Sequence, residues 1–298
     1  MNEQDYNRPR SNESIFKFIM PVLLMVAVQV IVQLFAGQLM FFYKGYKYET
    51  GTFDEFVAGY QQSLVSNKFT ILVTIFSTVI LAFVFLMWYR KEIIHAANMS
   101  LRKKCKIIGV LNWKIVPGII LIAAGMGIFA TYVTYLITMF KPEYLGANTD
   151  MVAMIGTNDS ALIDVLLIIY IVLISPVCQE LVFRGLTLGF AERRMTFVSA
   201  NIIQALLFAT LSRSVTQMIY FFVFGLILGY IYYRTENIAI PVICNVLFSI
   251  ARIVLYKVNV TESSLILFYI LLFAAMAGAY LGIVLVKQSV KPKQKDPS

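Results

Sequence analysis

Long apolar runs dominate this chain and restrict it to a membrane fold. A helix needs about 20 apolar residues to cross a bilayer, and runs of this kind recur between residues 16 and 286. Of the 298 residues, 59% are hydrophobic and 14% are charged, and the mean hydropathy is +0.77. Soluble domains do not have this composition. The sequence therefore predicts an all-α polytopic membrane protein.

About eight transmembrane helices are expected from the apolar runs. The predicted spans are residues 16–43, 69–89, 114–140, 161–178, 196–212, 215–233, 237–256 and 264–286. Only Arg213 and Ser214 separate the fifth span from the sixth, so we expect these two spans to form a tight hairpin.

The positive charges indicate how the predicted helices are oriented. Lys and Arg are concentrated in the connections 90–114 and 179–195 and in the tail after residue 286, whereas the connection 141–160 is poor in them. Such an excess marks the cytoplasmic side. We therefore expect a multi-pass protein of the cell membrane, in the plasma membrane of a bacterium, with both termini in the cytoplasm. The net charge of +9 then lies against anionic lipid headgroups, and no nucleic-acid partner is expected.

The charge and hydropathy patterns divide the chain into four parts. These are a polar, disordered cytoplasmic leader at 1–14, N-terminal transmembrane helices at 15–158 with a basic cytoplasmic loop at 90–113, a helical core at 159–256, and a last transmembrane helix with a basic cytoplasmic tail at 257–298.

The three cysteines do not indicate a disulfide framework. Cys105, Cys178 and Cys244 form no CxxC pair, and the last two fall at membrane depth. We interpret them as small buried hydrophobic residues.

An acid and a base stand one helical turn apart where the fourth apolar run ends. Glu180 and Arg184 share a helix face at the spacing i, i+4, so they can form an ion pair. A carboxylate at membrane depth is costly to desolvate, and such pairs are candidates for functional sites. The alternative is that the pair lies at the bilayer interface and ends a helix.

The later spans carry polar residues that lipid would not tolerate. We expect their polar faces to point toward one another and toward Glu180. Ordinary hydrogen bonding between helices, worth about 1 kcal/mol for each group, is the alternative. The residues concerned are Asn201, Gln204, Thr210, Ser212, Asn245, Ser249 and Arg252.

The order of these motifs resembles that of the CAAX-protease and bacteriocin-processing family, the CPBP or Abi family of intramembrane metalloproteases. The resemblance covers about residues 160–256 and implies a CPBP-like helical core. It is carried by Glu180, Arg184-Gly185, Phe208, Gly225, Gly229, Arg234-Thr235-Glu236-Asn237 and Pro241.

The catalytic positions of that family are not kept. Gln179 stands where the family has the first of two adjacent glutamates, and Ser212 stands where it has a histidine. Asn245 and Ser249 stand where it has a histidine and an asparagine. The resemblance therefore leaves only Glu180 and Arg184 as candidate catalytic residues. Together, Gln179, Glu180, Arg184, Ser212, Asn245 and Ser249 would form the former active site.

Peptide hydrolysis needs a general base and a group that stabilises the oxyanion. Serine and asparagine do not accept a proton usefully near neutral pH, and the single histidine, His95, lies in the basic loop far from the motifs. Zinc sites need three or four protein ligands. We therefore expect a pseudoprotease with no metal and no other cofactor.

Three functions remain open at the level of the sequence. The leading hypothesis is a non-catalytic family member that binds and regulates another membrane protein, for example a sensor histidine kinase, since the family includes such regulators. The alternative is an intramembrane endopeptidase or bacteriocin-immunity protein that uses Glu180. A transporter, prompted by Asp164, Arg252 and the Glu180–Arg184 pair, lacks the expected inverted repeats.

Overall fold

The computed structural model describes residues 15–47, 52–95, 113–140, 151–158, 160–212, 214–258 and 265–289. Within these ranges the chain is helical and no strand occurs, so the predicted all-α fold is confirmed. The elements are η1 (Ile15–Phe18), α2 (Met20–Lys47), α3 (Phe53–Leu64), α4 (Asn67–Tyr89), η2 (Arg90–His95), α6 (Ile115–Phe140), η3 (Met151–Met154), α8 (Ala161–Ile169), η4 (Tyr170–Ile174), α9 (Ser175–Glu180), η5 (Leu181–Leu188), α10 (Gly189–Ala191), α11 (Phe197–Thr210), α12 (Val215–Thr235), α13 (Ala239–Val258) and α14 (Leu265–Ser289).

Seven helices in the described ranges are long and apolar enough to cross a membrane, which makes the chain a multi-pass membrane protein. They are Met20–Lys47, Asn67–Ile94, Ile115–Phe140, Ala161–Ala191, Val215–Thr235, Ala239–Val258 and Tyr269–Ser289. The leader at 1–14 and the tail from 290 onward lie outside the described residues.

The expected span at 196–212 is shorter than predicted. Its helix, α11, has 14 residues, a length of about 21 Å against a hydrocarbon core of about 30 Å. The hairpin with α12 is present, because the ring of Phe197 at the start of α11 stacks on Tyr233 near the end of α12, with centroids 4.0 Å apart. The short helix therefore still reverses the chain direction.

The fourth helix is longer than predicted. Ala161–Ala191 is one apolar stretch of 31 residues, in which π-helical turns (η4 and η5) separate α8, α9 and α10. The predicted loop at 179–195 is therefore wrong over most of its length. Glu180 and Arg184 interrupt the apolar pattern without ending the helix, because they pair with each other inside the bundle. The alternative in which the pair ends a helix is wrong on that point, because the helix continues to Ala191.

Basic residues collect at one end of the bundle, which we call the basic end. Lys17 Nζ lies 3.2 Å from Glu92 Oε2, and Arg193 Nη2 donates to the backbone oxygen of Glu92 over 2.9 Å. Arg234 Nη2 donates to the backbone oxygen of Lys287 over 3.1 Å. These contacts join η1 to η2, the segment after α10 to η2, and the end of α12 to the end of α14. The grouping agrees with the predicted loop parity.

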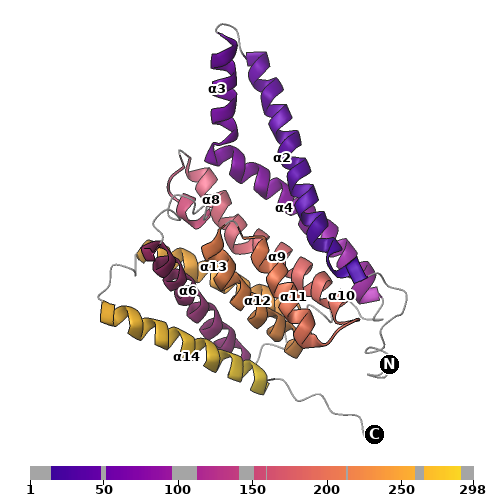
Figure 1. Cartoon of the computed structure of the whole chain (residues 1–298), viewed down its shortest axis with the longest axis vertical. Coiled ribbons are helices and arrows are strands. Elements are labelled where there is room, and N and C mark those ends of the chain that lie inside the picture. The colour runs from indigo at the N-terminus through magenta and orange to yellow at the C-terminus, as the bar shows by residue number, and fades with distance from the viewer. Residues whose placement is uncertain are drawn as a thin grey trace.

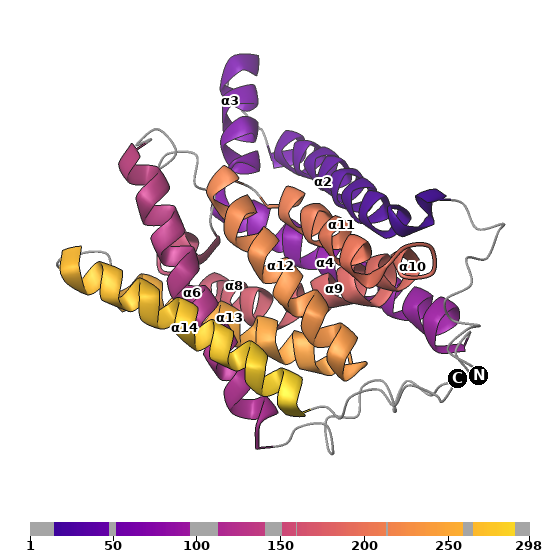
Figure 2. The same cartoon turned by 60° about the horizontal axis from the view of Figure 1, so that its bottom comes forward.

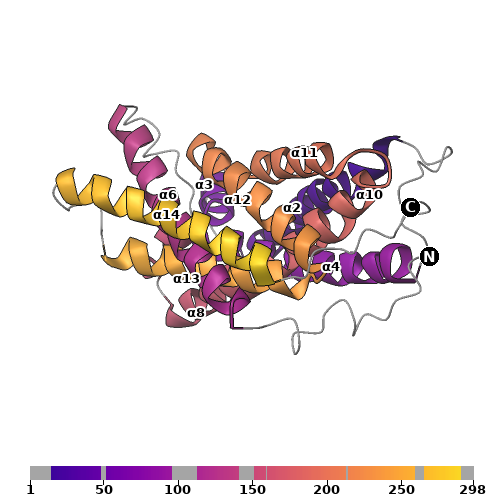
Figure 3. The same cartoon turned by 90° about the horizontal axis from the view of Figure 1, so that it is seen from below.

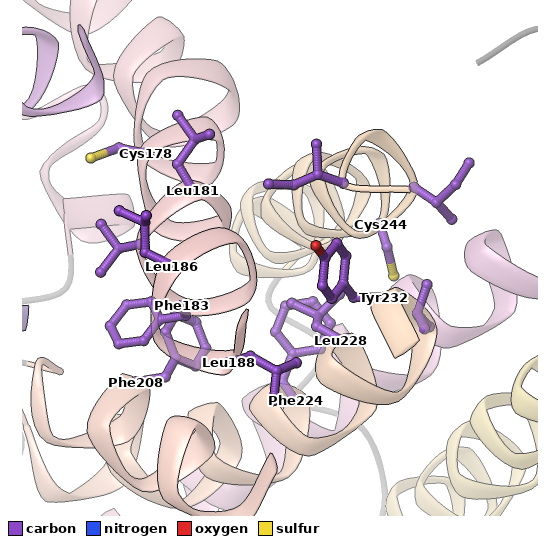
Figure 4. Packing of buried hydrophobic residues seen from close by; sticks show 14 of the residues in the cluster. Cys178, Leu181, Phe183, Leu186, Leu188, Phe208, Phe224, Leu228, Tyr232 and Cys244 are labelled. Carbon is purple, nitrogen blue, oxygen red and sulfur yellow. The ribbon is translucent and has the colours of Figure 1, made fainter. Parts of the chain in front are cut away.

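The segment from 180 to 191 forms the axis of the bundle, and every residue in it is buried. Figure 4 shows Phe183 and Leu186 of this segment packed among side chains of other helices. The Phe183 ring meets the Phe208 ring edge to face at a centroid distance of 5.0 Å. Cys178 and Cys244 are buried free thiols in the same region, as predicted. A helix buried on all sides can hold polar groups only if neighbouring helices supply partners.

The aromatic face of α3 packs against α2. Tyr60 donates from its hydroxyl to the backbone oxygen of Gly37 over 3.3 Å, and its ring lies 5.3 Å from that of Phe41. Figure 1 shows α3 and the adjoining end of α2 projecting beyond the other helices. The first half of α2 lies along the bundle and contacts α4 and η5.

Small residues let α6 and α14 approach closely. A Cβ added to Gly282 of α14 would lie 2.5 Å from the backbone oxygen of Gly118 of α6, and one added to Gly125 would lie 2.5 Å from that of Ala275. Gly118 meets Gly282, and seven residues later Gly125 meets Ala275, seven residues earlier on α14. The two helices are therefore antiparallel. α14 lies on the outside of the bundle and packs against α6 (Figures 1, 2 and 3). Van der Waals packing between backbones holds such a pair in a membrane.

We predict that Gly282→Ala weakens the attachment of α14. The added methyl group would meet backbone atoms of α6, which cannot rotate away, so overpacking should cost about 1 kcal/mol or more. Gly278→Ala, one turn earlier, is the matched control, because its Cβ would only touch Leu121 at 3.9 Å. Thermal unfolding of both variants in the same detergent checks this, and equal midpoints would contradict the close approach.

Candidate functional site

A buried ion pair lies at the centre of the bundle. Arg184 Nη1 donates to Glu180 Oε1 over 3.0 Å, and both side chains are 0% exposed. The Arg184 guanidinium also lies over the Phe208 ring, 4.7 Å from its centroid. The π-helical η5 keeps both charged residues on the same continuous helix. The pair is thus fully removed from solvent.

Asn245 separates this ion pair from the open space of the bundle. Its Nδ2 donates to Glu180 Oε1 over 2.8 Å and to Gln179 Oε1 over 3.2 Å. Gln179 in turn donates from Nε2 to Ser175 Oγ over 3.1 Å. A neutral chain of amide and hydroxyl groups therefore covers one oxygen of the carboxylate, as neutral hydrogen-bonding side chains allow.

The backbone oxygen of Gly225 on α12 anchors the other side of the pair. It accepts from Arg184 Nη2 over 3.1 Å and from Gln204 Nε2 over 2.9 Å. Gln204 also donates to Asn201 Oδ1 over 2.7 Å. Gly229 makes room for this arrangement, because an added Cβ would overlap Asn201 and Gln204. Gln204 therefore lies toward the ion pair, as expected, and shares a backbone acceptor with Arg184. Asn201 donates instead to the backbone oxygen of Leu226 and reaches the pair only through Gln204.

A cavity of about 250 Å³, lined by both polar and apolar side chains, lies next to the pair. No Asp, Glu or His side chain of the described residues lines it, and Glu180 itself does not reach it. Arg252 is the charged residue on the wall, with its guanidinium 5.4 Å from the ring centroid of Tyr220. The uncharged polar residues on the wall are Gln29, Gln33, Thr74, Ser77, Thr78, Ser175, Gln179, Ser212, Gln217, Asn245 and Ser249.

The structure brings the predicted site residues together in two layers. Gln179, Ser212, Asn245 and Ser249 line the cavity, whereas Glu180 and Arg184 lie buried behind Asn245.

Two other expectations have different outcomes. Thr210, expected on the same polar face as Ser212, is exposed and bonds to the backbone oxygen of Leu207 instead. Asp164, which prompted the transporter hypothesis, accepts from Gly156 N and Asn158 Nδ2 over 3.0 and 2.6 Å at the start of α8. That carboxylate fixes a local turn.

Several wall residues were not among the predicted site residues. Gln29 and Gln33 of α2 lie far in sequence from the motifs, and Gln217 of α12 lies five residues after Ser212, yet all three line the cavity. The only signal for the first two is their i, i+4 spacing inside an apolar run. Sequence spacing alone does not tell which helix neighbours which.

The side chains around Glu180 do not fit a metal ion. Within the described ranges, no three His, Cys, Asp or Glu side chains form a group that could hold one. Glu180 Oε1 already accepts from Arg184 and Asn245, and a guanidinium at that distance would repel a divalent cation. The remaining oxygen, Oε2, has no hydrogen-bond partner among the described residues, but a single carboxylate oxygen is not a zinc site.

The described residues of the cavity wall offer mainly hydrogen-bond donors and acceptors among their polar groups. Amide and hydroxyl groups on the wall can donate and accept hydrogen bonds, but none can take a proton from water near neutral pH. The one carboxylate of the pair is sealed from the cavity by Asn245.

Comparison with known proteins points to one family. The family model for type II CAAX prenyl endopeptidase Rce1-like proteins matches residues 161–251. A Bacillus subtilis (strain 168) protein named "Putative membrane peptidase YdiL" is 23% identical over 131 residues, which are 41% of this chain and 54% of that protein. The chain therefore spans about half the length of that relative. No solved structure matches.

Proposed function

We propose that this multi-pass membrane protein, whose residues 161–251 belong to the CPBP family of CAAX prenyl endopeptidase-like proteins, is a non-catalytic member. Its function is to bind another membrane protein and to regulate it. The partner is an integral membrane protein, for example a sensor histidine kinase. The chain resides in the cell membrane with its basic end toward the cytoplasm, the side on which Lys and Arg collect.

The main support for this proposal is the set of side chains on the cavity wall. The family positions for a glutamate, two histidines and an asparagine hold Gln179, Ser212, Asn245 and Ser249, in that order. These groups can hold a polypeptide segment by hydrogen bonds but cannot activate water against it. A general base and its orienting partner are each worth about 10²–10⁴ in rate, so their joint loss favours binding without cleavage.

We predict that Ser212→Leu abolishes regulation by filling the cavity. A leucine there replaces a hydroxyl on the wall with a bulky apolar group, so a bound segment is displaced. Thr210→Leu on the same helix is the control, because Thr210 is exposed and lies away from the cavity. The measurement is complementation of a deletion strain at matched membrane levels, with co-purification of bound membrane proteins. Equal partner recovery from both variants would argue against the binding role.

Glu180→Gln distinguishes the binding function from the endopeptidase hypothesis, because only an endopeptidase that uses Glu180 would lose its function. The amide can still accept from Asn245 and Arg184, but it cannot act as a base. We expect this variant, compared at equal membrane level, to complement and to retain full-length partners. If it is inactive and an uncut membrane protein accumulates beside it, the chain is a protease that uses Glu180.

A further inference from the structure

One wall of the cavity comes from outside the family domain. Met25, Gln29 and Gln33 of α2 all line the cavity, and their spacing of four residues places them on one helix face. This part of the chain precedes the residues 161–251 that match the family. The motif residues Asn245 and Ser249 lie on α13, a different element. The cavity is therefore shared between the family core and the first transmembrane helix.

The two glutamines lie in the middle of a transmembrane helix. α2 starts at Met20 and ends at Lys47, so Gln29 and Gln33 are about 13–20 Å from its start. Neither side-chain amide has a hydrogen-bond partner among the described residues. A polar group without a partner in the hydrocarbon region costs several kcal/mol. Gln29 is half-buried and Gln33 is exposed. Both residues line the cavity, so an occupant of the cavity can satisfy their amides.

The groups around the cavity match those of a polypeptide backbone. Glutamine amides supply both donors and acceptors, and α4 adds Thr74 and Ser77 on the same side. On α13, Ser249 is 8% exposed and lines the cavity. A backbone in extended conformation presents N–H and C=O groups on both of its edges. It can therefore bond to α2 and to the core together.

We propose that Gln29 and Gln33 form the second wall of a binding site for an extended, uncharged polypeptide segment of the partner membrane protein. The inference rests on the proposed binding function and adds the residues that determine which segment is accepted. An acyl or prenyl chain does not suit this wall, because it would leave the amides unsatisfied. Phosphate headgroups are usually held by several cations, whereas Arg252 is the one charged residue among the described lining residues.

The experiment is photo-crosslinking of the full-length protein in native membranes. A benzophenone amino acid is placed at Gln33 on α2 or at Arg252 on α13, where it replaces a large side chain on the cavity wall, and the captured peptides are mapped by mass spectrometry. Leu34, which is 66% exposed and does not line the cavity, is the control position next to Gln33. We expect positions 33 and 252 to capture the same segment of one protein, and position 34 to capture lipid instead.

A second variant tests the glutamines directly. Gln29→Leu with Gln33→Leu should reduce capture at position 252 by about tenfold or more, which corresponds to roughly 1.4 kcal/mol, at unchanged protein level. If position 252 captures a polypeptide but position 33 does not, or if the leucines have no effect, the α2 wall is wrong and the proposed function stands. If both positions capture only phospholipid, or no polypeptide at all, the inference and the proposed function both fail.

Discussion

Replacing Arg184 with alanine is expected to lower the free energy of unfolding by about 3–5 kcal/mol, the cost of leaving one partner of a buried ion pair uncompensated. Both side chains of the pair are 0% exposed, so water cannot solvate the remaining carboxylate. The backbone oxygen of Gly225 would still accept from Gln204. Most of the lost stability therefore comes from the Glu180 carboxylate, which is left buried without its charged partner. Thermal unfolding in one detergent, compared with the wild type, measures the effect.

The double variant Glu180→Leu with Arg184→Met separates charge from packing. It removes both charges and leaves side chains of similar volume, and such replacements are often neutral or stabilising. We expect it to recover most of the stability that Arg184→Ala loses. If the double variant is as unstable as the single one, the stability does not depend on charge pairing.

Asn245→Leu is expected to lower the free energy of unfolding by about 1.5–3 kcal/mol, the usual worth of a hydrogen bond to a charged group. The substitution removes the donor that Glu180 Oε1 and Gln179 Oε1 share. It leaves the carboxylate with the single partner Arg184. The unfolding midpoint should fall clearly below that of the wild type.

Ser249→Ala, one turn further along α13, is the matched control for this substitution. Ser249 lines the same cavity, but its hydroxyl bonds to no described residue, so its loss should change the midpoint little. If both variants unfold at the wild-type midpoint, Asn245 does not stabilise the buried carboxylate.

The membrane fold follows almost directly from the sequence. The apolar runs predicted the all-α architecture and the approximate helix count, because a bilayer requires about 20 apolar residues for each crossing. The predicted helix boundaries were wrong at two places, where the apolar pattern of the sequence does not reflect how the helices pack. Charged residues at 180 and 184 suggested a helix end, and a run of sufficient length at 196–212 suggested a full span, although α11 has 14 residues.

Most residues of the candidate site could also be named from the sequence. Gln179, Ser212, Asn245 and Ser249 could be named because the motifs resemble those of the CPBP family, and the spacing of four residues placed Asn245 and Ser249 on one helix face. The sequence did not indicate that these residues form a cavity wall and that Glu180 lies buried behind it. Burial depends on which helices surround a segment, and a linear pattern of polar residues does not specify this.

The sequence by itself determined that the chain crosses a membrane, which residues carry polarity into it, and that no general base accompanies Glu180 in the motifs. Only the tertiary structure decided that Asn245 separates Glu180 from the cavity and that Gln29 and Gln33 of a distant helix complete the wall. The physical reason is that hydropathy and helical period act along one chain segment, whereas hydrogen bonding and exclusion of solvent depend on side chains from several helices meeting in space.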